Sequence, residues 1–185
     1  MKIAFFSLTT FAALTVLASA QAPVGPGSVT LGKIAPAVIK TPEYTISNGP
    51  QKRSTPGSWL EVEVPFDTKP EEIDSLDFKY TVLVDKMLID GTVTHIIIPA
   101  GRDHYSVMYI APRTLLKATG GKPLTTASIG NIWVSVEKQG QKLAEAALKP
   151  SAMPNLPHLP GMLSKPETPF APLFWDRYEA TAPKK

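Results

Sequence analysis

The sequence predicts an all-β protein: an antiparallel β-sandwich of about seven strands, with one short helix and an extended proline-rich C-terminal tail. Three observations predict this class. Apolar residues in the middle of the chain recur with a period of two, β-branched and aromatic types dominate these runs, and turn-forming residues separate them at intervals of roughly 8–12 residues. A sandwich needs this pattern because alternate side chains of each strand point into the space between its two sheets.

The run SWLEVEVPF at residues 58–66 shows the alternation most clearly. One face of this run carries Leu60, Val62, Val64 and Phe66, and the other carries Trp59, Glu61, Glu63 and Pro65. We therefore expect a half-buried strand with an aliphatic face toward the core and a charged face away from it.

The run LDFKYTVLVDKMLIDGTVTHIIIPAG at residues 76–101 predicts a β-hairpin. Its strongest turn signal is Asp90-Gly91, because a type I′ turn needs positive φ at both central residues. Counting outward from this turn pairs Leu88 with Val93 and Lys86 with His95. The predicted core face comprises Phe78, Tyr80, Val82, Val84, Leu88, Val93 and Ile97.

Further strands are predicted at residues 29–31, 37–40, 44–47, 104–111 and 128–138. A turn at Gln139-Gly140 leads into KLAEAAL, whose alanine and glutamate favour helix. We assign this run to a strand, since it would make only a short, weak helix and a turn signal directly precedes it. The short helix is expected in PRTLLKATGG, with Pro112 at its first position and paired glycines at its end.

The chain divides into four segments. Residues 1–20 have the features of a secretory signal peptide: a positive Lys2, an apolar stretch, and the small residues Ala18-Ser19-Ala20. Residues 21–27 form a short lead-in, residues 28–149 form the sandwich domain, and residues 150–185 form the tail, which we expect to dock on the domain. The later runs are too short to cross a bilayer, so the mature chain is expected to lack a transmembrane segment.

Composition narrows the possible functions. The chain has no cysteine, which excludes disulfides and thiolate-based metal or catalytic sites. Its 19 basic and 16 acidic residues give a net charge of only +3, and the basic residues are scattered. Nucleic acid is therefore not an expected partner.

Catalytic and metal-binding patterns receive little support. The three histidines, His95, His104 and His158, do not have the spacing of a zinc motif, although His95 and His104 could meet across neighbouring strands. Glu61 and Glu63 share a strand face at a spacing of about 6.6 Å, which overlaps the separation in inverting glycosidases. A solvated strand face gives the same pattern. We predict no catalytic, metal or cofactor-binding residue and no enzymatic activity.

Aromatic residues are more informative. Trp59 and Trp133 both fall opposite the aliphatic faces of their strands, so the alternation exposes two indoles. The tail ends in a block that contains Phe170, Phe174, Trp175 and Tyr178. We expect Phe170, Phe174 and Trp175 to shield one of the exposed surfaces. The alternatives are that a partner binds the tail or that the tryptophans stack on sugars.

Four segments carry a resemblance to a known group of proteins. They are the leader ending ASAQA, the run SWLEVEVPFDTKPEEID, the run MLIDGTVTHIIIPAG and the ending TPFAPLFWDRYE. Together they resemble small exported envelope proteins of Verrucomicrobia, encoded among type IV pilus-like genes. This resemblance implies an immunoglobulin-like sandwich similar to the head domain of archaeal type IV pilins, and it carries over no functional residues. Pilins keep an apolar N-terminal helix, whereas here the apolar stretch precedes the cleavage site, which favours an accessory role.

The sequence thus predicts an exported, non-enzymatic immunoglobulin-like module that mediates protein contacts at the cell envelope, beside a pilus or secretion apparatus. The expected location is the periplasm, the outer membrane surface or the medium. Expected partners are envelope or pilus-associated proteins. The alternative is a carbohydrate-binding, adhesin-like module that uses exposed tryptophans to bind a host glycan.

Overall fold

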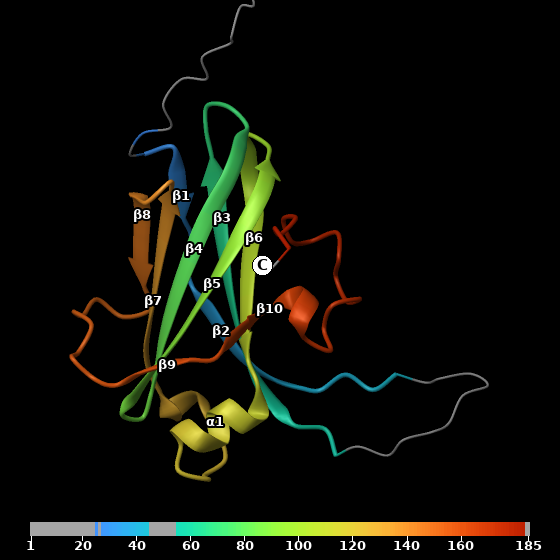
Figure 1. Ribbon diagram of the computed structural model, residues 1–185, viewed down its shortest axis with the longest axis vertical. Coiled ribbons are helices and arrows are strands. Elements are labelled where there is room, and N and C mark those ends of the chain that lie inside the picture. Colours follow the sequence, from blue (N-terminus) through green and yellow to red (C-terminus); the bar gives the residue numbers. More distant parts are fainter. Residues whose placement is uncertain (1–24, 26, 45–54, 184–185) are drawn as a thin grey trace, which may run out of the picture.

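Two β-sheets packed face to face form the protein (Figure 1). The computed structural model describes residue 25, residues 27–44 and residues 55–183. The strands are β1 (Val29–Leu31), β2 (Ala35–Lys40), β3 (Ser58–Thr68), β4 (Ile73–Val84), β5 (Met87–Ile98), β6 (Gly101–Ile110), β7 (Ile129–Lys138), β8 (Gln141–Ala147), β9 (His158–Pro160) and β10 (Met162–Ser164). The helices are α1 (Pro112–Ala118) and the 3-10 turns η1 (Thr126–Ser128) and η2 (Lys165–Glu167).

The first sheet has the order β1-β3-β6-β10, with β2 also paired to β3, and the second has the order β8-β7-β4-β5-β9. Neighbouring strands are antiparallel except β5 and β9, which are parallel. The predicted all-β sandwich is confirmed, with ten strands in the described residues rather than about seven. Two of these, β9 and β10, come from the proline-rich region and extend one sheet each.

The core lies between the sheets and follows the predicted alternation. Leu60, Val62 and Val64 of β3 have no exposed surface, and neither do Phe78 and Val82 of β4. Full burial of one such side chain contributes about 1.5–3 kcal/mol before the entropy of ordering the chain is subtracted. The alternation therefore supplies a core that holds the sandwich without covalent cross-links.

The long hairpin forms, but its turn lies elsewhere than predicted. The chain reverses at Asp85-Lys86, where Val84 pairs with Met87 and Asp85 has a φ of 51°. The predicted turn residues, Asp90 and Gly91, lie instead inside β5 and pair with residues of β4.

The shifted turn changes every predicted pair across the hairpin. Leu88 pairs with Leu83, Val93 with Phe78, and His95 with Leu76. His95 is consequently not the partner of Lys86 but lies on the core face, with 1% of its surface exposed. Ile97, predicted in the core, is 66% exposed.

Gly91 is required by packing rather than by a turn. A Cβ atom at this position would lie 2.4 Å from Cβ of Met162 and 2.8 Å from Cε of Met108. A glycine therefore allows β6 and β10 of the first sheet to approach the middle of β5 closely. The glycine of an aspartate-glycine pair can thus permit close packing inside a strand, whereas the turn rule considers only its role in a turn.

The other local predictions fare better. Gln139 and Gly140 have φ values of 51° and 81° and form the turn between β7 and β8, so the KLAEAAL run is a strand. Helix α1 begins at Pro112 and is followed by Gly120 and Gly121, both with positive φ.

Near the N-terminus, β1 covers residues 29–31 and β2 includes residues 37–40, as predicted. Of the strand expected at residues 44–47, Tyr44 lies outside any strand and the rest falls outside the described residues. The signal-peptide prediction, residues 1–20, also lies outside them.

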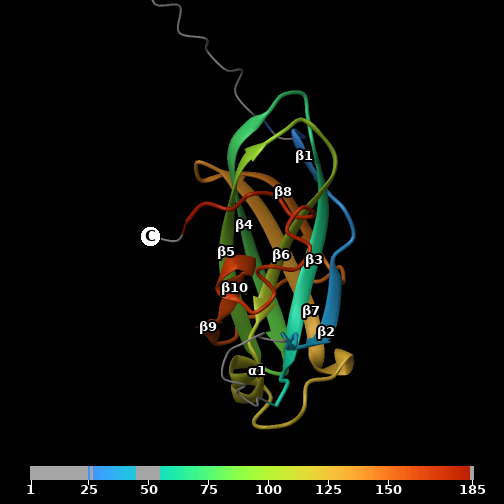
Figure 2. The same cartoon turned by 90° about the vertical axis from the view of Figure 1, so that its right-hand side faces the viewer.

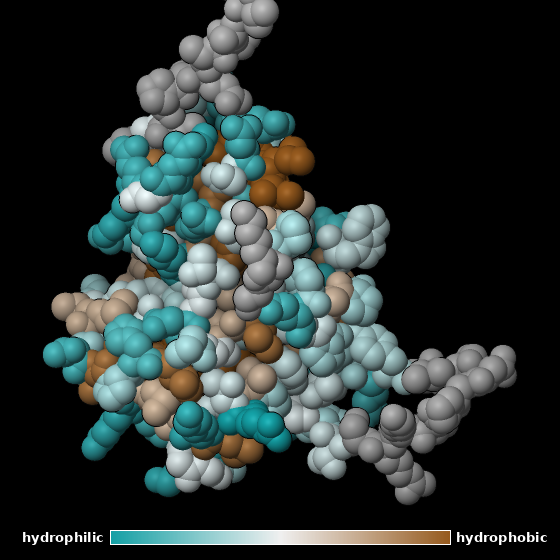
Figure 3. All heavy atoms as spheres, viewed as in Figure 1, coloured by the Kyte–Doolittle hydropathy of each residue, from teal (hydrophilic) through white to brown (hydrophobic). Residues whose placement is uncertain are grey.

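The C-terminal segment, residues 165–183, lies across the outside of the first sheet, in front of β3 and β6 (Figure 2). The view in Figure 3 shows hydrophobic residues as several small groups among hydrophilic ones. No helix within the described ranges is long and apolar enough to cross a membrane.

Candidate functional site

A second apolar cluster lies outside the sandwich core, between the first sheet and the C-terminal segment. The buried members are Trp59, Val107, Tyr109 and Phe170. The ring of Phe170 meets Trp59 edge-on at 5.5 Å between centroids and stacks on Tyr109 at 4.8 Å. Both geometries are favourable for aromatic pairs. Trp59, predicted to be exposed, is therefore only 8% exposed.

Polar contacts hold the same segment beside this cluster. Arg177 donates from Nε to Oε2 of Glu63 at 3.0 Å and from Nη2 to Oε1 at 2.8 Å. The hydroxyl of Tyr178 also donates to Glu63, and the guanidinium of Arg177 lies 3.8 Å from the centroid of the Tyr105 ring. A two-bond arginine-carboxylate contact is among the stronger ion pairs because both groups are planar.

The two glutamates of β3 have opposite environments. Hydrogen bonds from Arg177 and Tyr178 lower the pKa of Glu63 below its usual range. Burial raises the pKa of Glu61, although a hydrogen bond with Tyr109 opposes the shift. Glu63 is thus a binding partner of the C-terminal segment, which the charged face of residues 58–66 alone does not reveal.

Two of the aromatic residues predicted to shield this surface do not do so. Phe174 is 68% exposed and Trp175 is 77% exposed. They lie in a run of turns between Phe170 and Arg177, and Phe174 has a φ of 50°. We call Phe174 and Trp175 the aromatic tip. The segment is therefore anchored on both sides of two aromatic side chains that point into solvent.

A buried polar chain connects the two sheets. The Tyr80 hydroxyl donates to Ser106 Oγ at 2.6 Å, and Oγ lies 2.8 Å from Nε2 of His95. On the other side of the imidazole, Nδ1 lies 3.3 Å from the carbonyl oxygen of Glu179. A neutral imidazole that accepts at Nε2 and donates from Nδ1 satisfies all of these groups.

Two groups of this hydrogen-bonded series have strongly shifted pKa values. Burial lowers the pKa of His95 to about 4, against the opposing hydrogen bond to the Glu179 backbone. Burial also raises the pKa of Tyr80 well above its usual range. Ser106 has no exposed surface, so solvent does not reach its hydroxyl. The arrangement serves to fill the core with paired polar groups.

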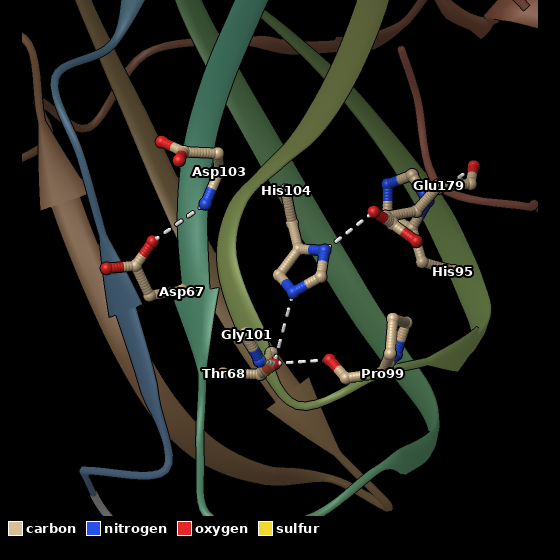
Figure 4. Close-up of polar contacts among 8 residues, drawn as sticks. All are labelled: Asp67, Thr68, His95, Pro99, Gly101, Asp103, His104 and Glu179. Atoms are coloured by element: carbon tan, nitrogen blue, oxygen red, sulfur yellow. Dashed lines mark hydrogen bonds and ion pairs between the residues drawn. The ribbon is translucent and has the colours of Figure 1, made fainter. Parts of the chain in front are cut away.

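His104 forms a second link to the C-terminal segment (Figure 4). Its Nδ1 lies 2.7 Å from Oε1 of Glu179, and its Nε2 lies 3.4 Å from Oγ1 of Thr68. His95 and His104 therefore do meet a common residue, Glu179, one through the backbone and one through the side chain. The third histidine, His158, is remote from both in the fold and contacts Asp90 at 2.6 Å.

Among the described residues, no three His, Asp or Glu side chains come together in a way that could hold a metal ion.

The outer face of the second sheet has a different character. A groove with a volume of about 660 Å³ runs over β4, β7 and β8, and the segment after β8 forms one wall. Trp133 is half-buried in this groove, and its Nε1 donates to the Ser151 carbonyl at 2.8 Å. Charged side chains, Lys79 and Glu145, line the same groove. This indole keeps part of its surface free, as the strand alternation predicts.

Comparison with known proteins fits this architecture. A protein-family model matches residues 20–185. The chain belongs to this family. A crystal structure of a protein from Akkermansia muciniphila, a member of the Verrucomicrobia, superposes with a TM-score of 0.73 at 23% identity and covers 85% of this chain and 94% of that one. That likeness shows the fold. The comparison with curated proteins finds no match.

Sequence reasoning missed three residues of the C-terminal segment that contacts the first sheet: Lys165, Arg177 and Glu179. The letters DRYE at residues 176–179 show alternating charges, which mark a polar surface. Their partners lie 75 and 114 residues away along the chain, and no local pattern encodes such a distance.

Proposed function

We propose that the protein is an exported, non-enzymatic module that mediates protein contacts at the cell envelope, beside a pilus or secretion apparatus. The aromatic tip, Phe174 and Trp175, is its contact surface. The observation that carries this proposal is that two adjacent large aromatic side chains are 68% and 77% exposed on a segment that is fixed at both ends.

Fixation is what makes the tip suited to binding. Phe170 is buried against Trp59 on one side, and Arg177 is held by Glu63 on the other. The segment that carries the tip would therefore lose little conformational entropy when a partner binds. Tryptophan is enriched among the residues that dominate binding energy at protein interfaces.

Location supports the same role. The leader predicted at residues 1–20 would export the chain, and the Akkermansia muciniphila protein with a similar structure shares the sandwich. A rigid sandwich is a common scaffold for contacts outside the cytoplasm. The proposed location is the periplasm, the outer membrane surface or the medium, and the proposed partners are envelope or pilus-associated proteins.

Site-specific photo-cross-linking in cells tests this role. A photoreactive side chain at position 175 should give a discrete cross-linked product with another envelope protein, and Phe174→Ala should weaken it. The matched control is position 116, because Leu116 is also an exposed apolar residue but lies on α1. Equal products at both positions, or none at 175, would contradict the proposal.

A second candidate, carbohydrate binding, is favoured by the groove at Trp133. Its indole lies among Thr81, Ser135 and two lysines, a mixture of aromatic face and hydrogen-bonding groups that suits a sugar ring. Trp59 no longer supports this reading because Phe170 covers it. A glycan array with the wild type, Trp133→Ala and Trp175→Ala tests it: binding that only Trp133→Ala abolishes would support this function.

A further inference from the structure

A small pocket lies between the C-terminal segment and the first sheet, behind the aromatic tip. Its volume is about 200 Å³, and Val107, Trp175 and Tyr178 contribute to its walls. Ligand sites for drug-sized molecules usually measure about 300–1,000 Å³, so this pocket has room for a single ring or a group of that size.

Lys165 places a cation at this pocket. It is only 9% exposed, and its Nζ donates to the carbonyl oxygen of Ala171 at 2.8 Å. The ammonium also lies 5.6 Å from the centre of the Tyr178 ring. These contacts use one of its three N–H donors and one aromatic face.

No described carboxylate forms an ion pair with this ammonium. Glu63 is engaged by Arg177 and Glu179 by His104, while Asp176 acts on Lys165 only through longer-range attraction. Burial accordingly lowers the pKa of Lys165. A partly buried charge without a direct ion-pair partner carries a cost of desolvation, and an anion that entered the pocket would offset that cost.

The rest of the pocket favours a flat apolar group. Trp175 offers an indole that is mostly exposed, and Val107 is an apolar side chain of the covered cluster. His95 also lines the pocket, and its low pKa keeps the ring neutral near pH 7. The walls therefore provide stacking and apolar contact, and Lys165 provides the positive charge. The carboxylate of Glu179 also lines the pocket, and its Oε1 is held by His104.

We propose that this pocket binds a small organic carboxylate with one flat apolar group, the carboxylate on Nζ of Lys165 and the flat group against Trp175. A ring with a directly attached carboxylate fits both the volume and the placement of the cation. This site shares Trp175 with the contact surface proposed above, but it needs no protein partner, and Lys165 belongs to the pocket alone.

Titration of the protein without the predicted leader, residues 21–185, with benzoate tests the proposal. Benzamide is the uncharged probe of the same shape. We expect a saturable change in the NMR signals of the Trp175 indole and the Thr181 amide, with benzoate about tenfold tighter than benzamide. Lys165→Met should remove this preference, whereas Lys142→Met, which alters an exposed lysine on β8, should leave it unchanged.

Trp175→Ala gives a second, independent variant, since this side chain is 77% exposed and its loss should not disturb folding. It should weaken benzoate binding as read from the Thr181 amide. Absence of saturable benzoate binding, equal binding of benzamide, or a preference that survives Lys165→Met in a folded protein would overturn the proposal.

Discussion

The outer faces of the two sheets have the same sequence pattern but differ in how far their tryptophans are exposed to solvent. Each carries a tryptophan opposite an aliphatic stripe, Trp59 on β3 and Trp133 on β7. On the first sheet, Phe170 covers the indole and reduces its exposure to 8%, whereas on the second sheet the indole lies in an open groove. Strand alternation thus decides which way a side chain points, and a distant segment decides whether it meets water.

Removal of residues 165–185 should have the largest effect on this comparison. It uncovers Trp59 and Tyr109 together and deletes the partners of Glu63 and His104. We expect a loss of at least about 3 kcal/mol in the free energy of unfolding, measured by urea denaturation. An unchanged melting temperature would show that the segment does not stabilise the domain.

Single aromatic substitutions should separate anchor from tip. Phe170→Ala creates a cavity beside Trp59 and should cost about 3–4 kcal/mol, as for other buried phenylalanines. Phe174→Ala, its matched control, should change stability by less than about 0.5 kcal/mol because Phe174 is 68% exposed. Urea midpoints of the two variants provide the comparison, and similar losses would contradict the assignment.

Acidification should lower the free energy of unfolding through the buried imidazole of His95. The pKa of His95 is about 4 in the folded protein and about 6.5 when unfolded, so the unfolded chain binds more protons between these values. The contribution of the neutral His95 imidazole to the free energy of unfolding is therefore complete above pH 6.5. It is lost progressively as the pH falls toward 4, by up to about 3 kcal/mol.

Acidification also removes stability through Glu63, because the pKa of this carboxyl is lowered in the folded state. Unfolding free energies of wild type, His95→Gln and Glu63→Gln across pH 4–7 distinguish the two groups. His95→Gln should flatten the profile above pH 4.5, and Glu63→Gln should leave that part intact. A steep profile in His95→Gln would show that another group is responsible.

The smallest effect is expected from the ion pair itself. Arg177 is 42% exposed at its side chain, so solvent screens its attraction to Glu63. Arg177→Lys keeps the charge but lacks the planar guanidinium that matches the two carboxylate oxygens, and should cost less than about 1 kcal/mol in urea unfolding. A larger loss would mean that the pair, rather than Phe170, anchors the segment.

Much of the fold follows from local patterns. The alternation of Leu60, Val62 and Val64, the Gln139-Gly140 turn and the Pro112 helix start all report short-range geometry, and the structure agrees with each. The hairpin turn was wrong because Asp90-Gly91 satisfies a turn rule while serving close packing against Met162. Local letters do not separate these two uses of glycine.

The candidate sites depend more on distant contacts. Trp133 was correctly placed away from the core because alternation alone sets its direction. Trp59 and Glu63 were misjudged because their environments come from residues 168–182, far along the chain. His95 was misjudged because the hairpin turn lies at Asp85-Lys86, which changes its register. Lys165 was not singled out, since nothing in its neighbourhood indicates that a lysine there would be buried.

Acrylamide quenching of single-tryptophan variants tests the central comparison most directly. With the other tryptophans replaced by phenylalanine, Trp59 should be quenched slowly and Trp133 faster, and Phe170→Ala should raise only the Trp59 rate. If Trp59 is quenched as fast as the 77% exposed Trp175 in the intact chain, the C-terminal segment does not cover the first sheet and the account fails.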